Sequence, residues 1–408
     1  MTSLDVDNLP GVNSEFLRTI TTSIDPRTLT SISLTHATRI SSGTVATLVR
    51  KMPNVTHLNF KGCVNLNNAT FPEKVVQKLQ KLSYLNISYT QITGKAIALV
   101  YKHCPELATL KVSGCKYIVD SHTHVANIFP HSSEMLRSFK VRMCGLTQNT
   151  LKEILELFPN LETLDCSSTN IQRIRPFFSS EHESQLRKLN LSNCPDLDLT
   201  RPMDLDILYA CNPNLEHIYL TDARTHLPCT FLANLKTLFM PGLHGARTYF
   251  TDIVLHGHNL TYIDLSRTDL NLNSHTRPLA INVPNLRTLS LIETRIDDSA
   301  AEVISQMHTL RSLFLRGTAI SAEGMRTIVF GCPWLEEVDL ASCRRIGVLE
   351  RRTLFSSLRG EFWECLAEAK GKGSAVVGEN GKIYQVKRVY SGEEERDALV
   401  VVENNDVY

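Results

Sequence analysis

The sequence predicts an α/β solenoid, a chain of stacked units that each contribute one short strand and one returning helix. The first observation is a phrase of three apolar residues at spacing L-x-x-L-x-L, clearest at Leu107, Leu110 and Val112. The second is its recurrence at intervals of mostly 24 to 29 residues, the period of a leucine-rich repeat. The third is a cysteine or threonine three residues after the last apolar position, such as Cys115. Together they predict a leucine-rich-repeat horseshoe with a parallel concave sheet and a helical convex side.

Thirteen copies of the phrase span residues 29–347. Five are followed by cysteine and five by threonine, and the three weaker copies start at Leu29, Leu215 and Leu235. The thirteen copies begin at Leu29, Val55, Leu82, Leu107, Leu136, Leu161, Leu186, Leu215, Leu235, Leu260, Leu286, Leu310 and Leu335.

The phrase has a simple physical meaning. Alternate side chains of a strand point to opposite faces, so Leu110 and Val112 are expected inside and Lys111 outside. One repeat cannot bury its apolar edge alone, but stacked repeats share a continuous core. The small cysteine or threonine can bond to nearby backbone where the chain bends away from the sheet. The return segments show helical spacing, and Asp297 and Ser321 are expected to cap two of these helices.

Composition limits the possible functions. The net charge is +1, which gives no general attraction to nucleic acid or an anionic membrane. No apolar run approaches the ~20 residues that span a bilayer, and the first residues lack the features of a signal peptide. The 11 cysteines fall mostly on repeat positions, which favours reduced thiols and a cytoplasmic or nuclear protein. In that setting the N-x-S/T triplets at Asn54 and Asn86 have no meaning as glycosylation sites.

Two stretches carry a family resemblance. CPELATLKVSGCKYIVD (104–120) and CPWLEEVDLASCRRIG (332–347) resemble the cysteine-containing repeats of F-box/leucine-rich-repeat proteins and of their AMN-type and fungal relatives. The resemblance covers about residues 29–347. It implies an intracellular horseshoe that recognises other proteins, often as the substrate-receiving part of an SCF-type ubiquitin ligase, with a cullin-adaptor subunit as a further partner.

We expect four segments. Residues 1–28 are an N-terminal cap or a degenerate F-box-like segment, 29–347 the repeat domain, 348–370 a C-terminal capping helix and 371–408 a hairpin and tail. Within the first segment, residues 1–12 are expected to be a loose end.

The N-terminal segment supports two interpretations. A short helix over Glu15–Ser23 would turn Phe16, Leu17 and Ile20 inward and cap the first repeat. The same residues, after Leu9, resemble an F-box pattern, although the spacing is longer than in that family and later residues of the pattern are missing. At the other end, residues 349–369 read as a helix, Asn380-Gly381 as a hairpin turn, SGEEERD as a loop and the last residues as one more strand.

No catalytic motif is present: the sequence has no phosphate-binding loop, dinucleotide fingerprint or metalloprotease motif. His122, His124 and His131 lie near one another but lack a converging ligand set, so solvated histidines are expected rather than a metal site. We therefore expect no enzymatic activity, no cofactor and no metal.

The outward residues of the strands are the candidate binding site. A basic group is expected in the first half of the repeats, and an aromatic group follows it. Exposed aromatic rings beside cations are typical of protein-binding surfaces. The candidate residues are Lys111, Lys140, Arg142, Lys188, His217, Tyr219, Phe239, Tyr262 and Phe314.

These residues predict a non-enzymatic scaffold that binds a partner protein or an acidic segment on its concave face, without membrane contact. Alternatively, the aromatic rings are covered by the tail or by residues 241–250. A second function class is a GTPase-activating or inhibitor protein, against which stand the shorter repeats and the missing acidic tail. A third is weak nucleic-acid binding through the basic group, against which stands the near-neutral charge.

Overall fold

The computed structural model describes most of the chain, in two compact units. One comprises Met1–Leu199 with Asp206–Leu215, and the other comprises Thr200–Leu205 with Glu216–Tyr408. The described residues are 2–9, 11–23, 25–115, 128–129, 132–145, 147–174, 184–199, 207–208, 210–222, 233–242, 257–268, 283–372, 376–377, 383–391 and 394–401.

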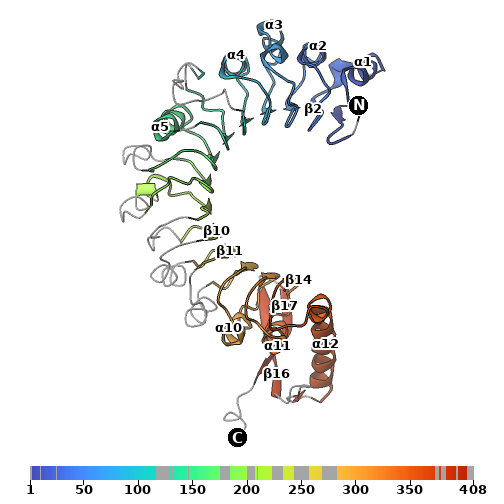
Figure 1. Ribbon diagram of the computed structural model, residues 1–408, viewed down its shortest axis with the longest axis vertical. Helices are drawn as coiled ribbons and strands as arrows, with labels where there is room; N and C mark the ends of the chain where they lie inside the picture. The colour runs from blue at the N-terminus through green and yellow to red at the C-terminus, as the bar shows by residue number, and fades with distance from the viewer. Residues whose placement is uncertain are drawn as a thin grey trace. The chain divides into compact units, whose positions relative to one another are not determined.

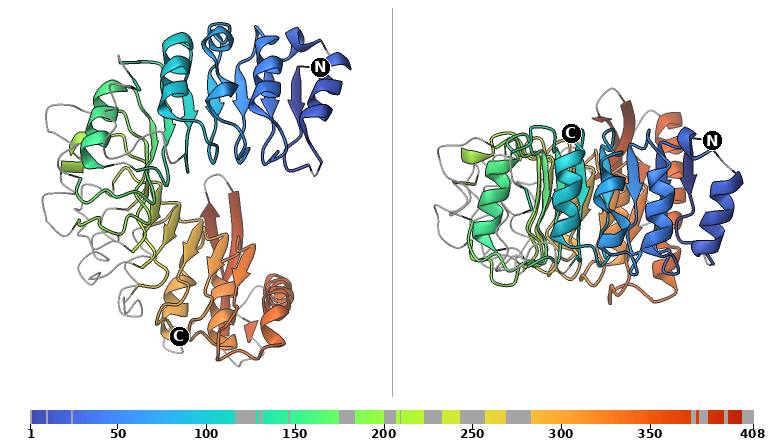
Figure 2. Two further views of the ribbon diagram at one scale, coloured as in Figure 1. Left: turned by 45° about the horizontal axis from the view of Figure 1, so that its top comes forward. Right: turned by 90° about the horizontal axis from the view of Figure 1, so that it is seen from above.

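The first unit contains eight three-residue strands, which pair in parallel and in register in chain order. Helices α1 to α4 stand side by side along one face of this sheet (Figures 1 and 2). The strands are β1 (Ser3–Asp5), β2 (Ser31–Ser33), β3 (His57–Asn59), β4 (Tyr84–Asn86), β5 (Thr109–Lys111), β6 (Ser138–Lys140), β7 (Thr163–Asp165) and β8 (Lys188–Asn190). The helices are α1 (Ser14–Ser23), η1 (Pro26–Thr28), α2 (Ser42–Arg50), η2 (Asn68–Thr70), α3 (Glu73–Val76), α4 (Gly94–His103) and α5 (Gln148–Leu157).

The second unit continues the same pattern with six strands, again parallel and in register. They are β9 (His217–Tyr219), β10 (Thr237–Phe239), β11 (Tyr262–Asp264), β12 (Thr288–Ser290), β13 (Ser312–Phe314) and β14 (Glu337–Asp339). The helices described are α10 (Asp298–Ile304), α11 (Ala322–Gly331), η5 (Glu350–Arg352) and α12 (Leu354–Lys372). A separate antiparallel sheet contains β15 (Val376–Val377), β16 (Ile383–Ser391) and β17 (Glu394–Val401).

All thirteen copies of the repeat phrase form the expected strands, so the prediction of a leucine-rich-repeat solenoid is confirmed. In the central repeat Leu107, Leu110 and Val112 are at most 4% exposed, while Lys111 between them is half-buried on the other face. Each such buried aliphatic side chain contributes roughly 1.5–3 kcal/mol relative to an exposed one.

The structure adds a fourteenth strand at the N-terminal end. β1 pairs with β2, and Leu4 and Val6 are buried, so the expectation of a loose end over residues 1–12 is wrong. Helix α1 buries Leu17 completely but leaves Phe16 38% exposed. Phe16 therefore does not point inward as the sequence suggested.

Every repeat has one residue in the left-handed backbone region, the third residue after its strand. In twelve of the fourteen the N–H of this residue donates to a carbonyl of the next repeat, as from Tyr89 to Ser113 at 2.8 Å and from Gly114 to Arg142 at 2.7 Å. A left-handed residue with a side chain costs roughly 1–2 kcal/mol. Gly114 is required for a second reason, because a Cβ there would lie 2.4 Å from the ring of Tyr89. The fourteen residues are Asn8, His36, Gly62, Tyr89, Gly114, Met143, Ser168, Asn193, Asp222, Gly242, Arg267, Glu293, Gly317 and Ser342.

The cysteine and threonine side chains at the turn also connect repeats. The carbonyl of Ile87 accepts the hydroxyl of Thr90 from its own repeat at 2.7 Å and the thiol of Cys115 from the next repeat at 3.1 Å. The same shared carbonyl occurs in two further pairs, Thr169 with Cys194 and Thr318 with Cys343. The predicted bonding of these side chains to nearby backbone is thus confirmed.

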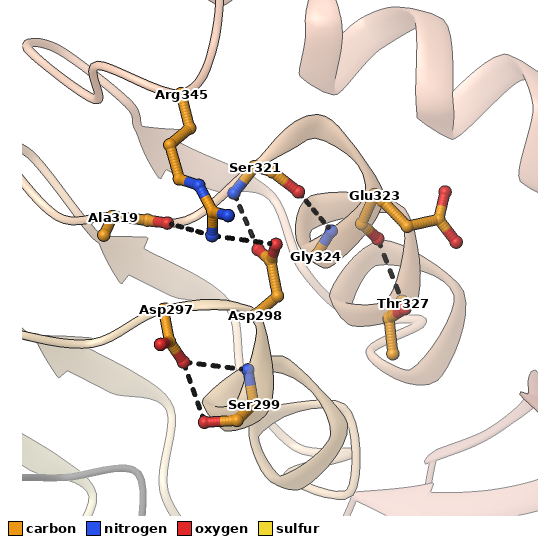
Figure 3. A network of polar contacts seen from close by, with 9 residues as sticks. All are labelled: Asp297, Asp298, Ser299, Ala319, Ser321, Glu323, Gly324, Thr327 and Arg345. Carbon is orange, nitrogen blue, oxygen red and sulfur yellow. Dashed lines mark hydrogen bonds and ion pairs between the residues drawn. The ribbon is translucent and has the colours of Figure 1, made fainter.

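Polar contacts connect the helical sides of repeats in the second unit. The side chains of Asp297 and Ser321 cap α10 and α11, as predicted. Asp298 accepts the backbone N–H of Ser321 at 2.7 Å and pairs with Arg345 of the following repeat at 3.3 Å (Figure 3). One carboxylate therefore joins three consecutive repeats.

The last repeat is covered by α12 and the antiparallel sheet. The Arg359 guanidinium donates to the carbonyls of Pro333 and Leu335 at 2.6 and 2.9 Å. Trp334 is fully buried in a cluster with Val389 and Ala398 of the sheet.

Two local expectations about this end need correction. The helix begins at Leu354 rather than at Leu349, which is 80% exposed. Residues 394–397 of the expected loop belong to β17. The expected turn at Asn380-Gly381 lies outside the described residues.

The turn cysteines generate a first prediction. Cys115→Ser should lower the free energy of unfolding by about 1–3 kcal/mol, because a hydroxyl replaces a buried thiol. Urea unfolding measures the change, with the half-buried Ser113→Ala as control.

Thiol titration provides a second readout. Burial raises the pKa of Cys63 to about 11 and of Cys144 to about 12, and the ten described cysteines are all buried and form no disulfide. At pH 8 at most one of the 11 thiols should react before unfolding. Stoichiometric zinc bound through these residues would contradict a structural role.

Candidate functional site

The structure places all nine candidate residues outward, eight on strands and Arg142 two residues after β6. The basic residues Lys111, Lys140, Arg142 and Lys188 all belong to the first unit. The aromatic residues His217, Tyr219, Phe239, Tyr262 and Phe314 all belong to the second. The two groups are therefore separate features, each carried by one unit.

Lys111 and Lys140 occupy matching positions on β5 and β6. Lys111 donates to the hydroxyl of Tyr84 at 2.9 Å and lies 4.8 Å from the centre of that ring. Burial lowers the pKa of Lys140, and the charges of Lys111 and Lys188 lower it further, against the opposing effect of Asp165. The structure thus holds several cations close enough to repel one another.

Tyr219 and Phe239 are matching residues of β9 and β10, with ring centres 5.7 Å apart. Burial raises the pKa of Tyr262 to about 12, and the charges of Asp264 and Tyr219 act in the same direction. Phe314 is in the same column as Phe239 but three strands further along, with Asp264 and Ser290 between them. It therefore does not join the pair.

The first of these aromatic side chains, His217, has its Nδ1 atom 2.9 Å from the hydroxyl of Thr237. The contacts described for the C-terminal sheet include those to Trp334, Arg311, Phe330, Pro333 and Lys370. None of these contacts reaches an aromatic residue of the candidate site, and residues 243–250 lie outside the described part of the chain.

The last residue of each strand reveals a rule that bears on function. When it is Asn or Asp, its side-chain oxygen accepts the backbone N–H two residues later, at 2.8–3.3 Å. Such a turn satisfies a donor and fixes the bend after the strand. The residues that do this are Asp5, Asn59, Asn86, Asp165, Asn190, Asp264 and Asp339.

Seven strands end in another residue, and two of these are serines with a substitute acceptor. After Ser33, the N–H of Thr35 is bonded by Asp7, and after Ser290 the N–H of Ile292 is bonded by Ser266. The remaining five strand ends are Lys111, Lys140, Tyr219, Phe239 and Phe314.

These five positions are all among the predicted site residues. Four are followed by an N–H with no hydrogen-bond partner in the described part of the chain, at Ser113, Arg142, Thr221 and Arg316. Phe239 is followed by Pro241, which has no N–H. The strands that lack a side-chain acceptor for the N–H two residues after the strand are thus the ones that end in a cationic or aromatic residue.

Two further side chains belong with the basic group, and sequence reasoning left them out. His57 and Tyr84 stack on neighbouring strands with ring centres 5.6 Å apart. The sequence could have indicated this pair, because both residues occupy outward positions on consecutive predicted strands. The unpaired N–H groups of Ser113 and Arg142 were not visible from spacing alone.

Other kinds of site find little support in the described ranges. They contain no cluster of three or more His, Cys, Asp or Glu residues that could hold a metal ion. His122, His124 and His131 lie outside them. No helix among the described residues is both long and apolar enough to cross a bilayer.

Comparisons with known proteins point to the same repeat class. No family model matches the chain. It is 33% identical over 104 residues to a protein of Arabidopsis thaliana named F-box/LRR-repeat protein 23, covering 24% of this chain and 23% of that protein. It is 27% identical over 184 residues to the BTB/POZ domain-containing protein FBL11 of Arabidopsis thaliana, covering 41% of this chain and 19% of that protein. The chain thus spans about a quarter or less of either relative.

Among solved structures, an internalin from Listeria monocytogenes overlaps 82% of this chain and 93% of its own, at 14% identity and a TM-score of 0.46. The assignment to the leucine-rich-repeat solenoids follows from the strands, burial and register of the chain itself.

The rule at the strand ends generates a second prediction. Lys140→Asn should raise the free energy of unfolding by about 0.5–1 kcal/mol, because the new side chain can accept the N–H of Arg142. Lys140→Gln removes the same charge without forming that turn and should gain less. Equal stability of the two variants in urea unfolding would contradict the rule.

Proposed function

We propose that this chain is a non-enzymatic scaffold that binds a partner protein through the outward side chains of its strands. The observation that carries the proposal is the replacement of the turn-forming Asn or Asp at Lys111, Lys140, Tyr219, Phe239 and Phe314. At the first, second, third and fifth of these positions the chain forgoes a hydrogen bond of about 1 kcal/mol, so another advantage is expected to maintain these side chains.

The aromatic pair suits protein recognition. Tyr219 and Phe239 are half-buried, held on neighbouring strands, and each ring has few rotatable bonds to order on binding. Rigid aromatic side chains of this kind contribute most to the binding energy of protein interfaces. The basic residues supply charge, which acts mainly on the association rate.

We further propose that the recognition serves an SCF-type ubiquitin ligase or a related regulatory complex, in the cytoplasm or nucleus. The F-box and leucine-rich-repeat names of the Arabidopsis relatives support this, as do the described cysteines, which form no disulfide. Residues 2–28 would close the end of the solenoid. Leu9 and Phe16, which are 54% and 38% exposed, would offer a surface to the cullin adaptor.

Truncating the aromatic pair tests protein binding. Phe239→Ala should weaken the complex with a copurifying partner by at least ~2 kcal/mol and leave the unfolding midpoint unchanged. Titration calorimetry measures the affinity of the wild type and of the variant for this partner. Thr288→Ala, which changes another outward strand residue, serves as control. If the melting temperature falls by several degrees while binding persists, the ring is covered within the chain and the site lies elsewhere.

The ligase proposal has its own test. A cullin-adaptor subunit should copurify with the tagged full chain, and a Leu9→Ala/Phe16→Ala variant should recover at least about fivefold less of it, about 1 kcal/mol. Both side chains are exposed, so the unfolding midpoint should stay constant, and Thr19→Ala on the same helix serves as control. Absence of the adaptor from the wild-type preparation would contradict the proposal.

A further inference from the structure

The outward face of β3 to β8 in the first unit is strongly basic. Each strand offers three outward positions: its first residue, its last residue and the residue two after the last. Over the six strands these positions carry five lysine or arginine side chains and one carboxylate, that of Asp165. The cations are Lys61, Lys111, Lys140, Arg142 and Lys188. Lys140 and Arg142 form no salt bridge within 4.0 Å among the described residues. The single carboxylate, Asp165, is the register partner of Lys140 on β7 and offsets only part of the positive charge at the centre of this face.

The same face presents unused backbone donors. After β4 and β8 the N–H groups are bonded by the side-chain oxygens of Asn86 and Asn190 at 3.1 and 3.0 Å. After β5 and β6 the equivalent N–H groups, of Ser113 and Arg142, have no partner within the described ranges. In the repeats of β4 and β8 the equivalent N–H is bonded by the side-chain oxygen of the Asn that ends the strand. In the repeats of β5 and β6 a lysine ends the strand and offers no such oxygen.

We propose that β5 and β6 bind carboxylates of an acidic, extended segment of a partner protein, with one carboxylate oxygen at each strand taking the place of the missing Asx oxygen. Each carboxylate would receive a backbone N–H, from Ser113 or Arg142, and the ammonium of Lys111 or Lys140. Charge-assisted bonds of this kind are stronger than neutral ones. The inference rests on the proposed function of this face as a protein-binding surface.

The geometry favours a peptide over a nucleic acid. Neighbouring strands are ~4.8 Å apart, so β3 to β8 span ~24 Å, which is about seven residues of an extended chain. Tyr84 fixes Lys111 and His57 stacks behind it, which gives one pre-ordered cation rather than a mobile one. Nucleic-acid binding depends on many phosphate contacts, and the net charge of +1 does not provide for them.

A binding experiment with the full chain tests the inference. A fluorescent oligo-glutamate peptide of about ten residues should bind at low salt, measured by anisotropy. Lys140→Asn should weaken binding about tenfold or more, because it removes the charge and occupies the N–H of Arg142. Lys140→Gln removes only the charge and should weaken binding about threefold. Lys78→Asn, an exposed lysine away from the strands, should leave binding unchanged.

Three outcomes would overturn the inference. They are no binding of the peptide, equal losses for Lys140→Asn and Lys140→Gln, or tighter binding of an oligouridine of the same charge with the same dependence on Lys140. Circular dichroism spectra and unfolding midpoints establish that each variant is folded. Failure here would leave the tests of Phe239 and of the cullin adaptor unaffected, so the two proposals fail separately.

Discussion

Within each unit the structure depends on the backbone hydrogen bonds that join one repeat to the next. They do not stop at the three-residue strands but continue through the first and third residues beyond them, as from Phe60 to Asn86 and from Gly62 to Ser88. To keep donating while the chain turns away, the third residue adopts the left-handed conformation in every repeat. The cost of that conformation in residues such as Met143 is offset by a bond that parallel stacking requires.

This constraint explains where binding residues can occur. The bend after each strand leaves one N–H outside the inter-repeat ladder, and in seven of the fourteen strands β1 to β14 the Asn or Asp at the strand end accepts it. A repeat that carries lysine, tyrosine or phenylalanine there gains a recognition side chain and loses that acceptor. The last residue of a strand can therefore serve either the stability of the bend or the binding of a partner. At this position the first unit has the cations Lys111 and Lys140, and the second unit has the aromatic rings of Tyr219 and Phe239.

Much of this fold could be predicted from the sequence, because burial alternates with period two and the phrase recurs. The strands, the inward leucines and the helix caps at Asp297 and Ser321 were all accessible in this way. Strand β1 was missed because Leu9 stands three residues after Val6, where the phrase has cysteine or threonine. The left-handed positions were hidden because residues such as Arg267 and Glu293 give no local signal for that conformation.

The candidate site was predictable only in part. Outward positions follow from the strand period, but the meaning of Asn86-x-Ser88 as a turn, rather than an idle glycosylation triplet, required the side-chain contact. Likewise Phe16 could not be placed, because a ten-residue helix with neighbouring apolar residues supports more than one inward face. The unpaired N–H groups beside Lys111 and Lys140 depend on hydrogen bonds that no residue pattern reports.

An alanine scan of the last residue of β3 to β8, read by the free energy of unfolding, tests the central claim most directly. If the Asx oxygens hold the bend, alanine at Asn59, Asn86, Asp165 and Asn190 should each cost about 1 kcal/mol. Alanine at Lys140, which supports no turn, should cost less than half as much. Equal losses at the two kinds of position, or no loss at the Asx positions, would contradict the account.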